Sequence, residues 1–174
     1  KRILYEDNKD DQRLIASITK IMTAIITIEN NPDLNKKITV GEEVLTMYGT
    51  SIYLQVGEQM SIKDLLYGLI LRSGNDAALV LAINTSKTEE NFVKLMNKKA
   101  KELNMKNTIF QNSHGLDEVT QNKSTAYDMA LLSAYAYKNP IYKEISSTKR
   151  YQTKTNDKSY IWYNRNKLLT TYKY

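Results

Sequence analysis

One segment near the N-terminus carries apolar residues on every side when it is read at helical spacing. It runs from Ser17 to Glu29 and is followed by Asn30, Asn31 and Pro32. A helix that is apolar all round has no face suited to water, so other elements must cover it. Its isoleucines would also suit a strand, but its length and the proline stop favour a helix. The sequence therefore predicts a buried helix over residues 17–29.

The remaining sequence predicts several more helices, separated by turns and short extended pieces. Ser61 and Asp64 form a capping-box pattern, and Asp76, Thr88 and Ser124 or Thr125 are also expected to cap helices. Strands are expected at 2–6, 149–153 and 159–163, and short strands and turns across 38–60. An extended piece is expected at 108–111, followed by a turn at 112–115. Helices are expected at 61–70, 77–83, 88–103, 124–136 and from 140 onwards. This order predicts a helix-rich α+β fold.

The rarest residue types narrow the possible chemistry. Among 174 residues there is one histidine, His114, and no cysteine. Disulfide scaffolds, thiol nucleophiles and thiolate-bound metals are therefore excluded, and so are histidine-rich metal sites. A serine–histidine–aspartate triad remains possible only if His114 is the base. Serine–lysine chemistry needs neither residue type.

The chain is basic, with a net charge of +6 from 20 lysines and 5 arginines against 19 acidic residues. Such a balance suggests an anionic partner such as nucleic acid, a membrane surface or a cell-wall polymer. The excess of lysine over arginine disfavours nucleic acid, because arginine is the better ligand for phosphates and guanine edges. The simplest interpretation is a solvated, lysine-rich surface. No apolar run is long enough for a membrane span, and residues 1–7 lack a signal-peptide pattern.

Ser17 and Lys20 form the most informative pair. On a helix their spacing brings the hydroxyl and the amine to one face. A serine hydroxyl becomes a good nucleophile when a base removes its proton. Lysine can be that base if its pKa falls, and apolar neighbours disfavour the charged amine. At the start of a helix, free backbone N–H groups could also stabilise an oxyanion formed beside Ser17.

The spacing alone is not specific, because a second S-x-x-K occurs at Ser146–Lys149 in polar surroundings. A capping serine followed by a surface lysine is the structural alternative for Ser17 and Lys20. Another element, Ser73-Gly74-Asn75, interrupts two apolar helices. There a serine hydroxyl can relay a proton, and an amide can hold a peptide carbonyl or fix the lysine. Its alternative is a helix end with Gly74 as the left-handed cap.

S-x-x-K followed by S-x-N belongs to the motif set of penicillin-binding proteins and serine β-lactamases. The chain resembles the D-alanyl-D-alanine carboxypeptidases of the low-molecular-mass penicillin-binding group along essentially its whole length. The similar segments are residues 2–6, 16–23, 51–54, 69–78, 107–117 and 124–131. Gly74 is typical of these carboxypeptidases, whereas class A β-lactamases usually carry aspartate there. The resemblance implies the helix-rich part of a β-lactamase/transpeptidase-like fold.

The resemblance also implies roles for individual residues. Ser17 would be the acylated nucleophile, Lys20 its base or proton shuttle, and Ser73 the relay towards the leaving D-alanine. Asn75 would hold the substrate backbone. His114 lies in a family segment near the site, and its role stays open between substrate binding and a structural turn. The substrate would be the D-Ala-D-Ala end of peptidoglycan stem peptides, with β-lactams as covalent inhibitors and no metal or organic cofactor.

One departure from the family pattern is large. The third motif, K-T-G on a strand that lines the cleft, is absent, and the nearest string is Lys154-Thr155-Asn156. We expect residues 1–174 to form a single, incomplete serine D,D-peptidase domain that lacks C-terminal strands and is inactive or nearly so alone. That strand would supply part of the oxyanion hole, and one lost donor costs on the order of 10²–10³ in rate.

The family resemblance implies an exported protein at the outer face of the cytoplasmic membrane, with membrane association only through segments absent from this chain and with no nucleic-acid partner. Two alternatives remain at this point. One is a β-lactamase or penicillin-recognising esterase on the same scaffold. The other is a non-catalytic wall-binding module, which the positive charge favours.

Overall fold

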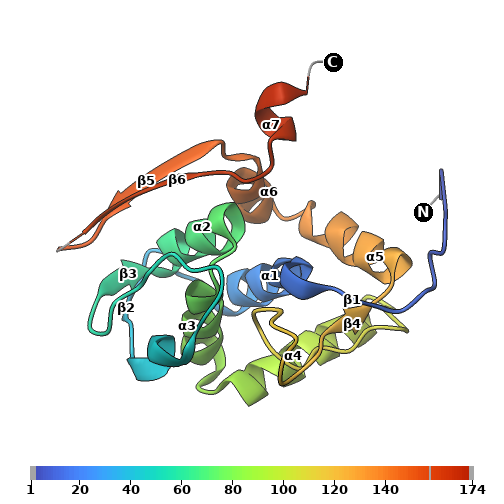
Figure 1. Cartoon of the computed structure of the whole chain (residues 1–174), viewed down its shortest axis with the longest axis horizontal. Helices are drawn as coiled ribbons and strands as arrows, with labels where there is room; N and C mark the ends of the chain where they lie inside the picture. Colours follow the sequence, from blue (N-terminus) through green and yellow to red (C-terminus); the bar gives the residue numbers. More distant parts are fainter. Residues whose placement is uncertain (1–2, 157, 173–174) are drawn as a thin grey trace.

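Helix α1 (Lys20–Asn30) lies at the centre of the molecule, with other helices around it (Figure 1). The computed structural model describes residues 3–156 and 158–172. Every residue of α1 from 22 to 28 is buried. Ile25 and Ile28 belong to one apolar core cluster, whereas Met22 and Ile26 belong to a second. The prediction of a buried helix is therefore confirmed from Lys20 onwards, whereas residues 17–19 form a 3₁₀ turn in which Ser17 and Ile18 are exposed. Helix α1 joins the two halves of the core.

Five helices of eight residues or more pack around α1 or against its neighbours. They are α2 (Ile62–Arg72), α3 (Asn75–Ser86), α4 (Glu89–Glu102), α5 (Ala126–Ala136) and α6 (Pro140–Ser147). Short 3₁₀ turns cover Ala16–Thr19 and Glu42–Thr46, and α7 (Leu168–Thr171) is the last helix of the described chain. None of the helices within the described ranges is long and apolar enough to cross a bilayer.

Three of the expected capping residues begin helices as predicted. The side chains of Ser61, Thr88 and Thr125 accept hydrogen bonds from backbone N–H groups in the first turns of α2, α4 and α5. Each bond satisfies a donor that has no partner inside the helix. Pro140 occupies the first turn of α6, as its fixed φ angle predicts.

The strands form three separate two-stranded antiparallel sheets. β1 (Arg13–Leu14) pairs with β4 (Lys123–Ser124), β2 (Lys37–Thr39) with β3 (Gln59–Ser61), and β5 (Arg150–Lys154) with β6 (Ser159–Tyr163). The β5–β6 hairpin confirms the expected pair of closing strands. Its alternation buries Tyr160 and Trp162 on one face and exposes the other. Tyr151 stacks on Tyr67 of α2, with ring centroids 3.6 Å apart, which fixes the hairpin on that helix.

Two local predictions are wrong. Residues 3–6 form no strand, and Arg2 of the expected strand 2–6 lies outside the described residues. Leu4 and Tyr5 are both 84% exposed, since within the described chain no neighbouring strand pairs with them. Asp76 also does not cap a helix at 77–83, because α3 already begins at Asn75 with Gly74 as its N-cap. The carboxylate of Asp76 has other partners, described below.

Candidate active site

The amine of Lys20 is the point where the sequence motifs meet. Ser17 lies in the exposed 3₁₀ turn that leads into α1, while Lys20 is only 3% exposed. Lys20 Nζ lies 3.0 Å from Ser17 Oγ, 2.8 Å from Asn75 Oδ1 and 2.6 Å from the backbone oxygen of His114. Three predicted site residues therefore contact Lys20, although His114 does so through its backbone.

The turn that carries Ser17 packs closely against Gly115. Gly115 has a φ of +86°, and a Cβ atom added there would lie 2.0 Å from the backbone oxygen of Ala16 and 3.0 Å from the nitrogen of Ser17. Ala16 itself has a positive φ of 43°, which is uncommon for a residue with a side chain. The loop of Gly115 thus packs directly on the strained residue that precedes Ser17.

The turn between α2 and α3 supplies Ser73 and Asn75. Ser73, rather than Gly74, takes the left-handed conformation at the end of α2, with a φ of 62°. Asn75 bridges two elements, because its Oδ1 accepts from Lys20 and its Nδ2 donates to the backbone oxygen of Tyr48 at 2.8 Å. Ser73 is half-buried, and no hydrogen bond of the described chain joins its hydroxyl to Ser17, Lys20 or Asn75.

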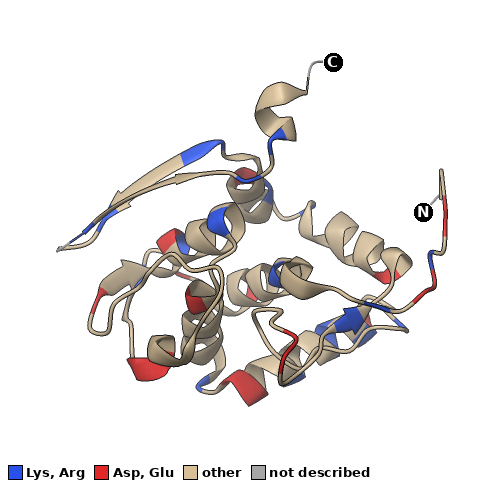
Figure 2. Ribbon diagram, in the orientation of Figure 1, with Lys and Arg blue, Asp and Glu red and all other residues tan. Residues whose placement is uncertain are grey.

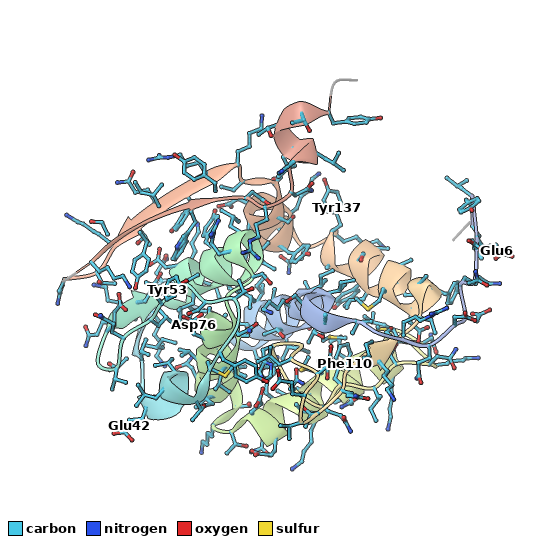
Figure 3. All side chains as sticks on the ribbon, in the orientation of Figure 1. Glu6, Glu42, Tyr53, Asp76, Phe110 and Tyr137 are labelled. Carbon is cyan, nitrogen blue, oxygen red and sulfur yellow. The ribbon has the colours of Figure 1, made fainter. Side chains whose placement is uncertain are left out.

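Asp76 fastens the neighbouring loop to the start of α3. Its carboxylate, 2% exposed, accepts hydrogen bonds from Ser51 Oγ and from the backbone N–H groups of Ile52, Leu54 and Ala77. Figure 3 labels Asp76 together with Tyr53, the exposed tip of this loop. The side chain that the sequence assigned to capping therefore holds loop 51–54 against the turn that carries Asn75.

The ring nitrogens of His114 contact groups other than Lys20. Its Nδ1 accepts a hydrogen bond from the backbone N–H of Leu116, and its Nε2 lies 3.7 Å from Glu89 Oε1. Burial lowers the pKa of His114, and the carboxylate of Glu89 acts in the opposite direction. These contacts favour the structural interpretation of His114 over direct substrate binding.

The surroundings of Lys20 change its acidity. Burial lowers the pKa of Lys20 to about 8, while the charge of Asp76 raises it and the charge of Arg165 lowers it further. A neutral lysine amine has two N–H bonds and one lone pair. The oxygens of Asn75 and His114 can only accept, so they take the two N–H bonds. The lone pair is then left for the hydroxyl proton of Ser17, which is the arrangement that general-base activation requires.

The other matches to the motifs lack such surroundings. Lys149 of the second S-x-x-K is exposed, and Ser146 Oγ donates to the backbone oxygen of Lys143. Lys154 and Thr155 lie at the end of the β5–β6 hairpin, where Thr155 Oγ1 donates to Glu58. No cluster of three potential metal-ligating side chains was found among the described residues.

Sequence reasoning missed three contributors to this site. Gly115 was assigned only to a turn, and the positive φ that glycine allows is the signal that could have marked it. The backbone oxygen of Tyr48 could not be found from residue types, because any residue supplies one. Arg165 acts on Lys20 from nearly 150 positions further along the chain, so only the fold reveals its influence.

Comparison with known proteins gives one consistent family. The whole chain, residues 1–174, matches the family described as D-alanyl-D-alanine carboxypeptidase. The carboxypeptidase DacF of Bacillus subtilis is 38% identical over 176 aligned positions, which cover 98% of this chain and 45% of that protein. The carboxypeptidase DacC of Escherichia coli is 40% identical over 141 positions, which cover 75% of this chain and 35% of that protein. The chain thus spans less than half the length of these relatives.

Solved structures agree with this assignment. The DD-transpeptidase of Streptomyces superposes with a TM-score of 0.89 at 32% identity, covering 97% of this chain and 71% of that one. A penicillin-binding protein homologue from Mycobacterium tuberculosis gives a TM-score of 0.91 at 26% identity, and the match covers 97% of this chain and 64% of that one. The expected fold, a helix-rich α+β part of the β-lactamase/transpeptidase-like architecture, is confirmed. By sequence and by structure, the chain belongs to the D-alanyl-D-alanine carboxypeptidase family.

Proposed function

We propose that the chain carries the acylation machinery of a serine D-alanyl-D-alanine carboxypeptidase. The observation that carries the proposal is the amine of Lys20, buried and placed 3.0 Å from Ser17 Oγ with two carbonyl oxygens to take its N–H bonds. Residues 1–174 would be one part of a single serine D,D-peptidase domain. The family membership supports this activity, and the site requires no metal for it.

The reaction begins with proton transfer from Ser17 Oγ to the neutral amine of Lys20. The alkoxide then attacks the carbonyl carbon of the D-Ala-D-Ala peptide bond and forms a tetrahedral oxyanion. The peptide C–N bond breaks, and the nitrogen of the leaving D-alanine takes a proton passed on from Lys20 through Ser73. Water then hydrolyses the acyl-enzyme ester and restores the hydroxyl of Ser17. Asn75 fixes Lys20 and holds the substrate amide, and β-lactams would acylate the same hydroxyl.

The proposed substrate determines the place of action. Peptidoglycan stem peptides lie outside the cytoplasmic membrane, so the protein would work there as an exported enzyme. Relatives named as D-alanyl-D-alanine carboxypeptidases, such as DacF of Bacillus subtilis, support this placement. No cofactor and no nucleic acid takes part in the proposed reaction.

Replacement of the nucleophile tests the proposal directly. In the complete gene product, Ser17→Ala should lose all covalent labelling by a fluorescent penicillin and all release of D-alanine from a pentapeptide. The change removes one oxygen from an exposed side chain, so the thermal unfolding midpoint should stay unchanged. Ser146→Ala, in the second S-x-x-K, is the matched control and should label normally. Labelling that persists in Ser17→Ala would refute the assignment, and rapid turnover of the β-lactam by the unaltered protein would identify a β-lactamase.

The acidity of Lys20 sets an expected pH dependence. Only the neutral amine can accept the proton of Ser17, and the pKa of Lys20 is lowered to about 8. The acylation rate should therefore rise about tenfold per pH unit below pH 8 and level off above it. The rate of penicillin labelling, measured from samples quenched at fixed times between pH 6 and about 10, gives this profile. A rate that is flat across pH 8, with the protein folded throughout, would contradict a basic role for Lys20.

A further inference from the structure

The positive charge of the chain is concentrated in its last part. Residues 138–174 hold nine Lys or Arg residues against two Asp or Glu residues, a net charge of +7. Residues 1–137 hold 16 Lys or Arg residues and 17 Asp or Glu residues, a net charge of −1. We call the described part of this region, residues 138–156 and 158–172 with α6, β5, β6 and α7, the cationic layer. Figure 2 shows its basic residues along the hairpin and at the start of α7.

The basic side chains of the cationic layer are not neutralised by neighbouring acids. Glu144, its described acidic residue, accepts from Tyr67 and pairs with Lys63, both of which lie on α2. Within the ranges that the structure describes, no carboxylate pairs with Lys149, Arg150 or Lys154. These three side chains are exposed. Their charges are therefore available to an anionic partner, which would release counterions on binding.

The outer face of the hairpin combines charge with apolar surface. Arg150 lies opposite Tyr163, Gln152 opposite Ile161 and Lys154 opposite Ser159, all with their side chains on the exposed face. Tyr163 is 60% exposed and Ile161 is 49% exposed. Arg150 and Lys154 are four residues apart, a distance of about 13 Å along a strand. Separate charges along a strip suit an extended chain with repeated anions, rather than one small anion.

We propose that the cationic layer binds a linear polyol-phosphate polymer along the outer face of the β5–β6 hairpin. Arg150 and Lys154 would contact phosphates about 13 Å apart on this face, and Lys149, which is exposed just before β5, would contact a further phosphate at its edge. Tyr163 and Ile161 would pack on the polyol carbons. The excess of lysine in this region, seven against two arginines, disfavours nucleic acid as the occupant. The strip also lacks a series of exposed aromatic rings on which bases could stack.

The hairpin lies next to the candidate active site. Lys158 Nζ donates to the backbone oxygen of Tyr53, at the tip of the loop held by Asp76. The backbone N–H of Arg165, just after β6, donates to Leu71 in the last turn of α2. A polymer on this face would keep the protein close to the wall that contains its proposed substrate. The binding itself does not depend on the proposed catalysis.

The test uses the complete gene product and fluorescent poly(glycerol phosphate) as the probe, with binding followed by anisotropy at several salt concentrations. The triple variant Lys149→Gln, Arg150→Gln, Lys154→Gln should bind at least about tenfold more weakly at low salt, and its affinity should depend less steeply on salt concentration. The matched control neutralises three exposed lysines of the other region, Lys94, Lys101 and Lys106, to glutamine. It should change the affinity less than about twofold, because these charges lie outside the strip.

Other probes identify the occupant. Ser17→Ala should bind the polymer like the unaltered chain, so a failure of the catalytic proposal would leave this result intact. Inorganic phosphate at the same phosphate concentration should not displace the probe. If both triple variants lose the same affinity for the polymer, the binding is unspecific charge attraction and the proposal is overturned. Tighter binding through the same three residues to single-stranded DNA, polyglutamate or phosphatidylglycerol vesicles would also overturn it.

Discussion

Replacing Lys20 with methionine should slow acylation of Ser17 by about 10²- to 10⁴-fold, because it removes the base beside the hydroxyl. Methionine is similar in length and apolar, so it suits a site that is 3% exposed. The oxygens of Asn75 and His114 would lose their donor, which costs about 1–3 kcal/mol for each buried group. Burial of an amine is also avoided, which offsets part of this loss. The second-order rate of penicillin labelling in the complete gene product, beside its unfolding midpoint, measures both effects.

Arginine at the same position separates proton transfer from hydrogen bonding. Lys20→Arg keeps donors for the two carbonyl oxygens, but guanidinium holds its proton at every accessible pH. It should therefore be about as slow as Lys20→Met, without the pH dependence near 8. Lys94→Met on the exposed side of α4 should label normally. Efficient acylation by a folded Lys20→Arg variant would show that Lys20 does not act as the base.

The parts of the fold that depend on residues adjacent in the sequence could be predicted from the sequence. The apolar run after Ser17 predicted the central helix, and Ser61, Thr88 and Thr125 began their helices as expected. These signals are local, because a cap or an apolar face needs only the next few residues. The pairing of β5 with β6 was also local, since a short turn joins the two strands.

Features that depend on distant partners could not be predicted in the same way. The strand expected at 2–6 failed at residues 3–6, because a strand needs a partner to bond its backbone. Asp76 has the residue type and position of a cap, yet the N–H groups of Ile52 and Leu54 compete for its carboxylate. Only the tertiary structure brings that loop to α3.

The candidate site shows the same division. The spacing of Ser17 and Lys20 placed the hydroxyl and the amine together, and the structure gives 3.0 Å between them. Asn75 was a candidate from its motif, but its contact with Lys20 joins residues 55 positions apart. The chemistry of Lys20 depends on that contact and on burial, so spacing alone favoured a capping serine with a surface lysine over catalysis. Ser73 and its proton relay stay a prediction.

Replacing Gly115 with alanine should disable Ser17 without touching any reacting atom. The new Cβ would lie 2.0 Å from the backbone oxygen of Ala16, so one of the two loops must move. Ala16 immediately precedes Ser17, and a displacement of the nucleophile by about 1 Å can cost on the order of 10² in rate. The left-handed φ of +86° adds about 1–2 kcal/mol of backbone strain for alanine. We expect penicillin labelling to fall at least about 100-fold and the unfolding midpoint to drop by several degrees.

Gly57→Ala provides the matched control, because it isolates the contact from the backbone strain. Gly57 has nearly the same φ, +85°, but a Cβ atom there would meet nothing within 4 Å. Both variants therefore carry the cost of a left-handed alanine, whereas only Gly115→Ala displaces the turn before Ser17. Gly57→Ala should lose some stability and label at the normal rate. If the two variants label equally well, the packing of Gly115 on Ala16 does not hold Ser17 in place, and the nucleophile is positioned by α1 alone.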